Sequence, residues 1–313
     1  MMQKENGVYD IIILGAGPAG LTAGIYASRS RLRTLILNEG ATGGQVTLTN
    51  EIANYPGVET TTGFSLINTM KNQAKSFGCS IKSNIKITSL EMEGEIKSVT
   101  VNGKESYRSK SLILTPGGKP RMLNIPGEEK FKGSGVSYCA TCDGDFFTDK
   151  HVVVVGGGNS ALEEAVSLTK YASKVTIVHQ FDHFQAFAHA IEEVRQNDRI
   201  EIILQSELRE IYGGSTVEGV RIENMADGTM TELAADGVFI FIGYLPNTGF
   251  FRERVMMNER EEIVVSSLME TNIEGVFAAG DAVPKRFRQV TTAVADGTVA
   301  ALAAADYIRG SGN

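Results

Sequence analysis

The 313-residue sequence lacks most features of secreted, membrane-spanning and nucleic-acid-binding proteins. Its three cysteines, Cys79, Cys139 and Cys142, are too few for a disulfide-stapled scaffold, so a reducing cytoplasm is expected. No apolar run approaches the roughly 20 residues that a membrane helix needs. The first residues, MMQKENGVYD, carry neither the apolar stretch nor the cleavage site of a signal peptide. We therefore predict a cytoplasmic protein without a membrane partner.

An excess of positive charge is also missing. The sequence has 30 basic and 37 acidic residues, a formal net charge of −7, which argues against wholesale binding to nucleic acid. Only 7 residues are proline and 42% are hydrophobic, an ordinary composition for a folded chain. The length suits two domains of roughly 150 residues each.

One pattern occurs twice in the chain. The segments YDIIILGAGPAGLTAGIYASR, from residue 9, and HVVVVGGGNSALEEAVSLTK, from residue 151, each pass from a β-branched strand through a glycine-rich turn into a helix. This repetition predicts an α/β protein with two Rossmann-like dinucleotide-binding domains. We expect the second domain to be inserted in the first, which then comprises residues 1–120 and 247–313. The inserted domain would span 121–246, because GGKP and YLPNTG supply suitable connections.

The first glycine turn, GAGPAG, contains Gly15, Gly17 and Gly20 directly before a predicted helix. The first glycine allows a tight turn, and the second lets a pyrophosphate approach the backbone at the helix N-terminus. The following strand, TLILNEG, ends in Glu39, which can accept a hydrogen bond from a ribose hydroxyl. The alternative is a glycine turn that binds no ligand.

The second glycine turn, GGGNSA, has Ala161 in place of the third glycine. It predicts the same fold, but a nucleotide site that has lost its ligand and is kept for packing would show the same glycines.

The segment CATCDG places Cys139 and Cys142 in C-x-x-C spacing before Asp143. Two residues between the thiols allow a small disulfide ring, and a neighbouring carboxyl can deliver a proton when a thiolate leaves. The alternative is half of a zinc site, but the remaining cysteine and four scattered histidines do not form the other half, and no metal is expected. Cys79 is predicted to pack in the core.

Over nearly its whole length the chain resembles the low-molecular-weight bacterial thioredoxin reductases. GAGPAG, GGQVTLTNEIANYPG, CATCDG, GGGNSA, GYLPNT and GVFAAGDA occur in that family's order. The resemblance implies the flavin disulfide reductase fold, FAD as cofactor, a homodimer and thioredoxin as substrate. It also implies that Cys142 exchanges electrons with the flavin, Cys139 attacks the partner disulfide and Asp143 is the acid. The residues implied to contact FAD are Gly15, Gly17, Pro18, Ala19, Gly20, Glu39, Gly44, Gln45, Asn54, Thr115, Gly117, Gly280, Asp281, Arg288, Gln289 and Val290.

The segment HQFDHFQ, residues 179–185, contains no arginine or lysine. Family members that use NADPH hold its 2′-phosphate with arginines where this chain has Gln180, Phe181 and Gln185. Loss of these charge-assisted contacts argues against NADPH. NADH would need a carboxylate at the strand end, where the chain has His179 and Gln180.

A flavin accepts electrons singly, so a one-electron iron–sulfur carrier could replace a hydride donor. Within the wider family the chain most resembles the ferredoxin-dependent flavin thioredoxin reductases, which lack working nicotinamide-binding signatures. The segment PKRFR, with Lys285 to Arg288, is a candidate docking site for an acidic ferredoxin, or else merely a solvated loop. The rival prediction is an NADH-dependent thioredoxin or peroxiredoxin-system reductase.

Overall fold

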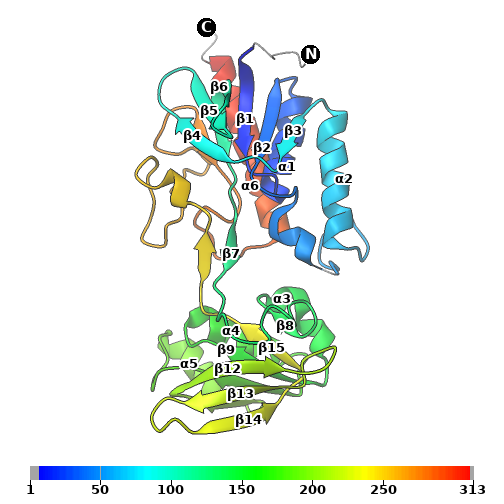
Figure 1. Cartoon of the computed structure of the whole chain (residues 1–313), viewed down its shortest axis with the longest axis vertical. Coiled ribbons are helices and arrows are strands. Elements are labelled where there is room, and N and C mark those ends of the chain that lie inside the picture. Colours follow the sequence, from blue (N-terminus) through cyan, green and yellow to red (C-terminus); the bar gives the residue numbers. More distant parts are fainter. Residues whose placement is uncertain (1–6, 50, 311–313) are drawn as a thin grey trace. The chain divides into compact units, whose positions relative to one another are not determined.

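The computed structural model describes residues 7–49 and 51–310, and the chain divides into two compact units. Unit 1 comprises residues 1–119 and 245–313, and unit 2 comprises residues 120–244. The boundaries predicted from the sequence lie one and two residues further along the chain. Figure 1 shows that each unit has its own sheet and helices.

Unit 1 is built on a seven-stranded sheet in the order β3-β2-β1-β6-β5-β4, with β17 also paired to β6. Strands β3, β2, β1 and β6 pair in parallel, as do β6 and β17, whereas β4, β5 and β6 pair antiparallel. The strands are β1 (Tyr9–Leu14), β2 (Thr34–Asn38), β3 (Ser80–Ser83), β4 (Ile87–Glu91), β5 (Lys97–Val101), β6 (Glu105–Leu114) and β17 (Val276–Ala278).

The helices of unit 1 begin with favourable residues. They are α1 (Pro18–Arg29), α2 (Gly63–Ser76) and α6 (Val290–Gly310), with the 3-10 helices η1 (Gly44–Leu48) and η3 (Gly249–Phe251). Proline suits the first turn of α1, where an N–H has no intrahelical partner. In α2, Thr62 is the N-cap, and its hydroxyl accepts a hydrogen bond from the Ser65 N–H at 3.1 Å. The apolar residues Leu66, Ile67 and Met70 then lie buried on one face.

Both faces of the unit 1 sheet are buried. Successive residues of β1 point to opposite sides, so Ile11 and Ile13 pack in the cluster that includes α1 and α6 residues. Ile12 and Leu14 pack in a second cluster with β4 and β5 residues. This burial accounts for the unbroken apolar run IIIL, which is typical of a parallel strand covered on both faces.

Unit 2 contains a parallel sheet in the order β11-β10-β9-β15-β8 and a separate antiparallel sheet in the order β12-β13-β14. The strands of the first sheet are β8 (Val136–Ser137), β9 (His151–Val155), β10 (Lys174–Val178), β11 (Ile200–Ile203) and β15 (Gly237–Ile240). Those of the second are β12 (Ser206–Tyr212), β13 (Gly219–Asn224) and β14 (Met230–Ala234). The helices are α3 (Ala140–Asp143), η2 (Gly144–Phe147), α4 (Asn159–Leu168) and α5 (Ala188–Arg195).

The chain enters and leaves unit 2 through two strands that are hydrogen-bonded to each other, β7 (Gly118–Pro120) and β16 (Tyr244–Pro246). Beside this ribbon, the Arg121 N–H donates to the Gly243 carbonyl and the Asn247 N–H donates to the Gly117 carbonyl, each at 2.9 Å. Among the described residues no helix is both long and apolar enough to cross a bilayer.

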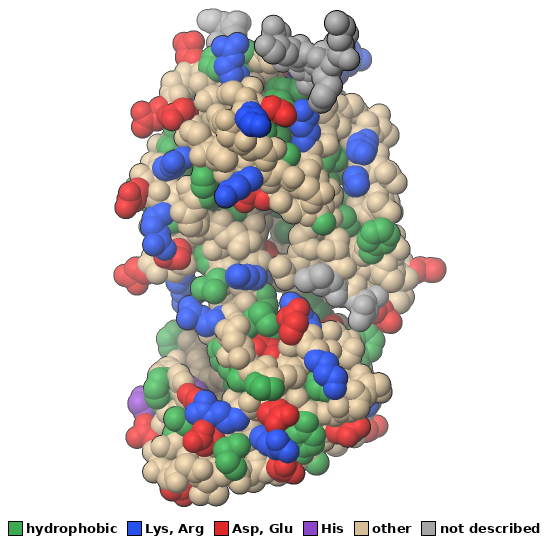
Figure 2. All heavy atoms as spheres, in the orientation of Figure 1, with side chains coloured by type: hydrophobic (Ala, Val, Ile, Leu, Met, Phe, Trp, Pro, Cys, Tyr) green, Lys and Arg blue, Asp and Glu red, His purple; other side chains and the backbone are tan. Residues whose placement is uncertain are grey.

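The visible face of unit 2 mixes charges of both signs. Figure 2 shows basic and acidic side chains interspersed over the β12–β14 sheet. Ion pairs join them across the strands, with Arg221 bonded to Glu210 at 2.6 Å and to Glu232 at 3.0 Å. This face therefore presents no single-sign surface to a charged partner.

Candidate active site

The first glycine turn joins β1 to α1 in a conformation that requires glycine. Gly15 has a φ of +117°, and a Cβ there would lie 2.1 Å from the Thr115 carbonyl oxygen. A Cβ on Gly20 would lie 2.0 Å from the Gly15 carbonyl oxygen. At Gly17, the N-cap of α1, a Cβ would meet no described atom within 4 Å. The turn is thus closely packed against the protein and open at Gly17.

The residues that end β2 hold this turn in place. The Asn38 side-chain oxygen accepts a hydrogen bond from the Ala16 N–H at 2.9 Å, and the Ala16 carbonyl accepts from the Gly43 N–H at 2.8 Å. Glu39 is exposed, and its Oε1 accepts from the Ile87 N–H at 2.8 Å. Sequence reasoning identified Glu39 but missed Asn38, whose only signal was its polar side chain at a strand end.

Two further strand ends close around the turn. Thr115, which follows β6, is buried, and its hydroxyl lies 3.1 Å from both the Leu14 and Gly15 carbonyl oxygens. Gly280, which follows β17, has a φ of +83°, and its N–H donates to the Asp296 carboxylate at 3.1 Å. Asp281 is the next residue and is half-buried.

The remaining predicted FAD residues lie in loops and helix starts of unit 1. Pro18 and Ala19 form the first turn of α1, and a Cβ on Gly44 would lie 3.8 Å from the Gly17 Cα. Gly117 has a φ of +62° and lies beside the β7 strand. Gln45 and Asn54 are exposed in the segment between β2 and α2. In the structure Gly44 and Thr115 therefore lie directly beside the glycine turn.

The basic segment before α6, predicted as a docking site or a solvated loop, is only partly exposed. Lys285 is ion-paired with Asp296, and its side chain is only 11% exposed. Arg288 is ion-paired with Glu262, whose side chain is 5% exposed. Arg286 and Phe287 remain exposed. These ion pairs were invisible in the sequence because the acidic partners belong to other elements.

The start of α6 follows directly. Gln289 precedes the helix, and its N–H lies 3.1 Å from the Thr292 hydroxyl oxygen, while Val290 is the first helical residue. This hydroxyl bond satisfies one of the N–H groups that a helix start leaves without an intrahelical partner.

The unit 1 turn fits a dinucleotide such as FAD. Gly17 leaves room for a pyrophosphate beside the N-terminus of a 12-residue helix, where the N–H groups and the helix dipole favour negative charge. Glu39, at the end of the adjacent strand, stands where a ribose hydroxyl donor is expected.

In unit 2, Cys139 and Cys142 form a disulfide at the start of α3. Cys139 is the N-cap residue of this four-residue helix, and Cys142 is its third residue. The Cys139 carbonyl accepts hydrogen bonds from the N–H groups of Cys142 at 3.3 Å and Asp143 at 3.2 Å. These bonds fix the loop that closes the disulfide ring. Both cysteines are only half-buried, so the disulfide is accessible for thiol exchange.

Asp143 is bonded to a residue that sequence reasoning missed. The Ser137 hydroxyl donates to the Asp143 carboxylate at 2.5 Å and accepts from the Cys139 N–H at 3.1 Å. Burial raises the pKa of Asp143; the Ser137 bond lowers it, and nearby Asp145 raises it further, leaving it above its usual value. Asp143 therefore keeps its proton to a higher pH than an exposed aspartate.

The third cysteine is in a different environment. Cys79 is free, 4% exposed and packed in the unit 1 core. Burial raises the pKa of its thiol to about 11. Cys79 is thus a core residue, as predicted, with little thiolate at neutral pH.

The second glycine turn repeats the backbone of the first. In each turn the N–H of the first glycine donates to the end of the next strand, from Gly15 to the Leu37 carbonyl at 2.9 Å and from Gly156 to the Val178 carbonyl at 3.1 Å. The strand registers agree, because Leu14 pairs with Leu37 and Val155 pairs with Val178. Two residues beyond Leu37 stands Glu39 in unit 1, and two residues beyond Val178 stands Gln180 in unit 2. The second turn therefore has a neutral amide where the first has a carboxylate.

Aromatic side chains fill the strand end in unit 2. His179 is buried, and its ring lies so close to Gly157 that a Cβ there would be 2.4 Å from its Nδ1. The ring stacks on Phe184 with centroids 5.8 Å apart, and its edge meets Phe181 at 5.4 Å. Burial lowers the pKa of His179, so this residue stays neutral at physiological pH and supplies no positive charge.

The loop that follows folds back on the glycine turn. The Gln185 N–H donates to the Gly157 carbonyl at 2.8 Å, and the Phe187 N–H donates to the Asn159 side-chain oxygen at 2.7 Å. Gln180 and Phe181 are exposed beside it. Unit 2 thus retains the backbone of a dinucleotide turn. Amide and aromatic side chains follow β10, where the ribose of a bound dinucleotide would lie.

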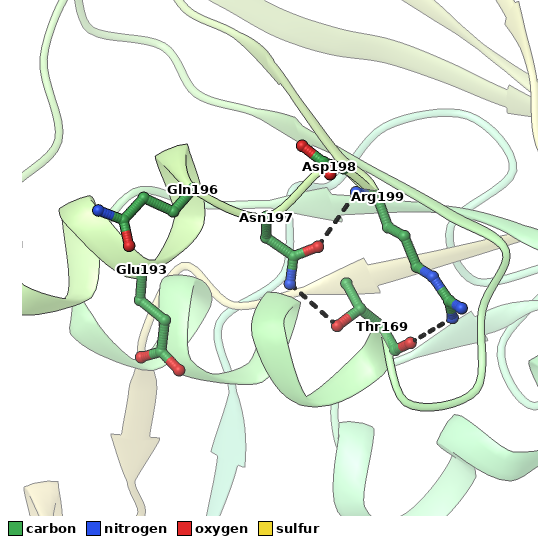
Figure 3. A pocket seen from close by; sticks show the side chains of 6 residues that line it. All are labelled: Thr169, Glu193, Gln196, Asn197, Asp198 and Arg199. Atoms are coloured by element: carbon green, nitrogen blue, oxygen red, sulfur yellow. Dashed lines mark hydrogen bonds between the residues drawn. The ribbon is translucent and has the colours of Figure 1, made fainter.

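A shallow pocket elsewhere in unit 2 involves none of the predicted site residues. Its lining residues are Thr169, Glu193, Gln196, Asn197, Asp198 and Arg199 (Figure 3). The Asn197 amide donates to the Thr169 hydroxyl at 3.2 Å, and Arg199 donates to the Thr169 carbonyl at 2.9 Å. These bonds join the end of α4 to the start of β11, so Thr169, Asn197 and Arg199 stabilise the local fold.

Comparison with known proteins identifies the family of this chain. A model of the pyridine nucleotide-disulphide oxidoreductases matches residues 9–297, which include both glycine turns and the disulfide. The chain belongs to this family. The family uses FAD, which agrees with the open turn at Gly17.

Similar proteins of this oxidoreductase family cover nearly the whole chain. A thioredoxin reductase of Peptoclostridium acidaminophilum is 44% identical over 311 residues, covering 97% of this chain and 98% of that protein. A 34.2 kDa protein of the rubredoxin operon of Clostridium pasteurianum is 45% identical over 307 residues, covering 98% and 99%. The crystal structure of the Streptococcus pyogenes thioredoxin reductase is 40% identical and superposes with a TM-score of 0.93, covering 98% and 100%. These matches establish the flavin disulfide reductase fold for this chain.

Proposed function

We propose that the protein is a FAD-dependent thioredoxin-disulfide reductase whose flavin receives electrons from reduced ferredoxin rather than from NADPH. The similar thioredoxin reductases and the Cys139–Cys142 disulfide support the first part. The single observation that carries the second is the register of the second glycine turn. It gives Gln180 the position that Glu39 has in unit 1, with Phe181 next to it and no basic group at either.

The proposed reaction is a thiol–disulfide exchange. Two electrons and two protons convert the Cys139–Cys142 disulfide to a dithiol. The Cys139 thiolate then attacks a thioredoxin disulfide, forming a mixed disulfide and releasing one thioredoxin thiolate. Attack by Cys142 on Cys139 breaks the mixed disulfide, re-forms the Cys139–Cys142 bond and releases dithiol thioredoxin.

FAD, when bound, supplies electron pairs to the disulfide and can itself be charged one electron at a time. In our proposal the open turn from Gly15 to Gly20 binds its pyrophosphate and Glu39 its ribose. Asp281 and the segment from Arg288 to Val290, which leads into α6, would contact the flavin. The helix dipole of α6 would favour negative charge there.

We propose that Asp143 donates the proton that a leaving thiolate needs. A sulfur that leaves as a thiolate must be protonated, and Asp143 follows Cys142 directly in the chain. Burial keeps its carboxyl protonated to a higher pH than usual, which suits a proton donor.

The three missing basic contacts should weaken NADPH binding. A charge-assisted hydrogen bond to a phosphate is worth about 1.5–3 kcal/mol when shielded from water. Gln180 and Phe181 are exposed, so we take about 1 kcal/mol for each of the three missing contacts. The total of about 3 kcal/mol corresponds to about 100-fold weaker binding.

A ferredoxin is a one-electron donor with an acidic surface, so its docking site should be basic or apolar. We assign this role to Arg286 and Phe287 because both residues are exposed, whereas the side chains of Lys285 and Arg288 are only 11% and 23% exposed. A cytoplasmic homodimer is also part of the proposal, by analogy with thioredoxin reductases.

One anaerobic experiment tests the donor. The flavin absorbance is followed after NADPH, NADH or reduced ferredoxin is mixed with the protein. We expect rapid bleaching with ferredoxin and slow bleaching with NADPH. In the triple variant Gln180→Arg, Phe181→Arg, Gln185→Arg, the apparent NADPH affinity should rise about 100-fold.

A control variant adds the same charge elsewhere in unit 2. Ala226→Arg, Met230→Arg, Thr231→Arg modifies exposed positions near β14 and should leave the response to NADPH unchanged. Rapid bleaching of the wild-type flavin by NADPH would refute the proposed donor. Rapid bleaching by NADH would instead support the NADH-dependent reductase.

A further inference from the structure

Ser137 occupies a special place beside the redox disulfide. It ends β8, is 5% exposed and precedes Cys139 by two residues. Its hydroxyl oxygen lies 2.5 Å from the Asp143 carboxylate, 3.1 Å from the Cys139 N–H nitrogen and 3.3 Å from the Cys139 carbonyl oxygen. One buried hydroxyl therefore contacts both ends of the short segment that carries the disulfide.

A serine hydroxyl has one proton to donate and two lone pairs to accept. When Asp143 is a carboxylate, the Ser137 proton points to it, and one lone pair accepts from the Cys139 N–H. When Asp143 is protonated, its O–H can donate to the second lone pair, and the Ser137 proton can turn to the Cys139 carbonyl. Every polar group in the set then keeps a partner in both states.

We propose that Ser137 is a positioning residue for proton delivery at the Cys139–Cys142 pair, holding the Asp143 carboxyl in both of its protonation states. This inference rests on the proposed function, because it assumes that Asp143 gains and loses a proton during turnover. A partly buried carboxyl without such a partner would lose a hydrogen bond in one of its two states.

The pKa of Asp143 reflects the same arrangement. Burial raises this pKa, whereas the Ser137 hydrogen bond stabilises the carboxylate and lowers it. Removing the hydroxyl should therefore move the Asp143 titration to higher pH. It should also leave the Cys139 N–H without this acceptor.

The test titrates Asp143 directly in the full-length protein with its cofactor. The infrared carboxylic-acid band of Asp143, assigned by its loss in Asp143→Asn, is followed against pH. Its midpoint should rise in Ser137→Ala and return in Ser137→Thr, which keeps a hydroxyl. Ser206→Ala is the matched control, because Ser206 is a buried strand serine bonded to the Leu204 carbonyl at 3.0 Å.

Two further readouts separate positioning from a purely structural role. In wild-type protein labelled with ¹⁵N-cysteine, the Cys139 amide signal should titrate with the midpoint of the Asp143 band. In turnover with thioredoxin, Ser137→Ala should lower kcat about tenfold with an unchanged KM. The decrease of kcat on the alkaline side of its pH profile should occur at a higher pH than in the wild type.

The outcomes distinguish this inference from the proposed function. A Cys139 amide signal that ignores the Asp143 titration would overturn the role of Ser137, even if Ser137→Ala does not fold. So would an unmoved Asp143 midpoint in folded Ser137→Ala. Failure of the wild-type protein to reduce thioredoxin would instead refute the proposed function. The infrared and amide titrations would still show whether Ser137 couples the Asp143 carboxyl to the Cys139 amide.

Discussion

Substituting Gly17 by alanine should weaken FAD binding without unfolding the protein. The backbone at Gly17 has φ −75° and ψ −175°, which any residue can adopt, and an added Cβ would meet no described atom within 4 Å. Alanine is a poorer N-cap than glycine by about 0.5–1 kcal/mol, and the lower entropy of the unfolded chain offsets about 0.4–1 kcal/mol of this cost. The free energy of unfolding of the apoprotein should therefore change by less than about 1 kcal/mol.

Flavin affinity should respond differently, because the new methyl group would occupy the space where the pyrophosphate approaches the backbone. Loss of one charge-assisted N–H bond to phosphate is worth about 1.5–3 kcal/mol, or about 10- to 150-fold in Kd. The measurement is a titration of apoprotein with FAD, followed by flavin fluorescence, together with thermal unfolding of the apoprotein.

Two glycine variants serve as controls. Gly158→Ala changes the equivalent open position of unit 2, where a Cβ would meet only the Gln185 carbonyl at 3.9 Å, so FAD affinity should not change. Gly20→Ala should destabilise the apoprotein, because its Cβ would lie 2.0 Å from the Gly15 carbonyl oxygen. An unchanged FAD Kd in Gly17→Ala would refute our assignment of the pyrophosphate site.

Three other predictions concern stability. Since burial raises the pKa of Asp143, the native state loses stability as pH rises through that pKa, so Asp143→Asn should raise the Tm at pH 8, with a smaller gain below about pH 4. Since burial lowers the pKa of His179, the unfolded chain binds a proton first as pH falls below about 6.5. His179→Phe should reduce the fall in Tm between pH 7.5 and 5, and an equal fall in both proteins would contradict the assignment. Gly297→Ala should cost about 1–3 kcal/mol in denaturant unfolding, because its Cβ would lie 2.2 Å from the Ala19 carbonyl oxygen, whereas Gly249→Ala, with no described atom in reach, should be nearly neutral.

The features that the sequence predicted best depend on local pattern. A strand, a glycine turn and a helix succeed one another within some 20 residues, so both turns could be recognised without tertiary information. The spacing of Cys139 and Cys142 likewise allowed a disulfide, which the structure contains. The α/β fold with Rossmann-like sheets followed from the repeated turn and is confirmed.

The features that it did not predict depend on contacts between distant segments. The ion pair between Lys285 and Asp296, which lies eleven residues later on α6, has no signal in the local sequence. The Glu39 bond to the Ile87 N–H spans 48 residues and has no local signal. Ser137 was overlooked for another reason, because a serine at the end of a short strand is unremarkable until its distance to Asp143 is known.

The ribbon of β7 and β16 bears on how such a chain could have arisen. Because these strands pair, the first and last residues of unit 2 are neighbours, and the Gly117 and Asn247 ends of unit 1 are joined by a hydrogen bond. A gene segment encoding residues 120–244 could thus be removed, and a few flexible residues would reconnect the host polypeptide. Because the chain crosses between the units only at this ribbon, we expect each unit to acquire substitutions, or to lose a ligand, with little disturbance to the folding of the other.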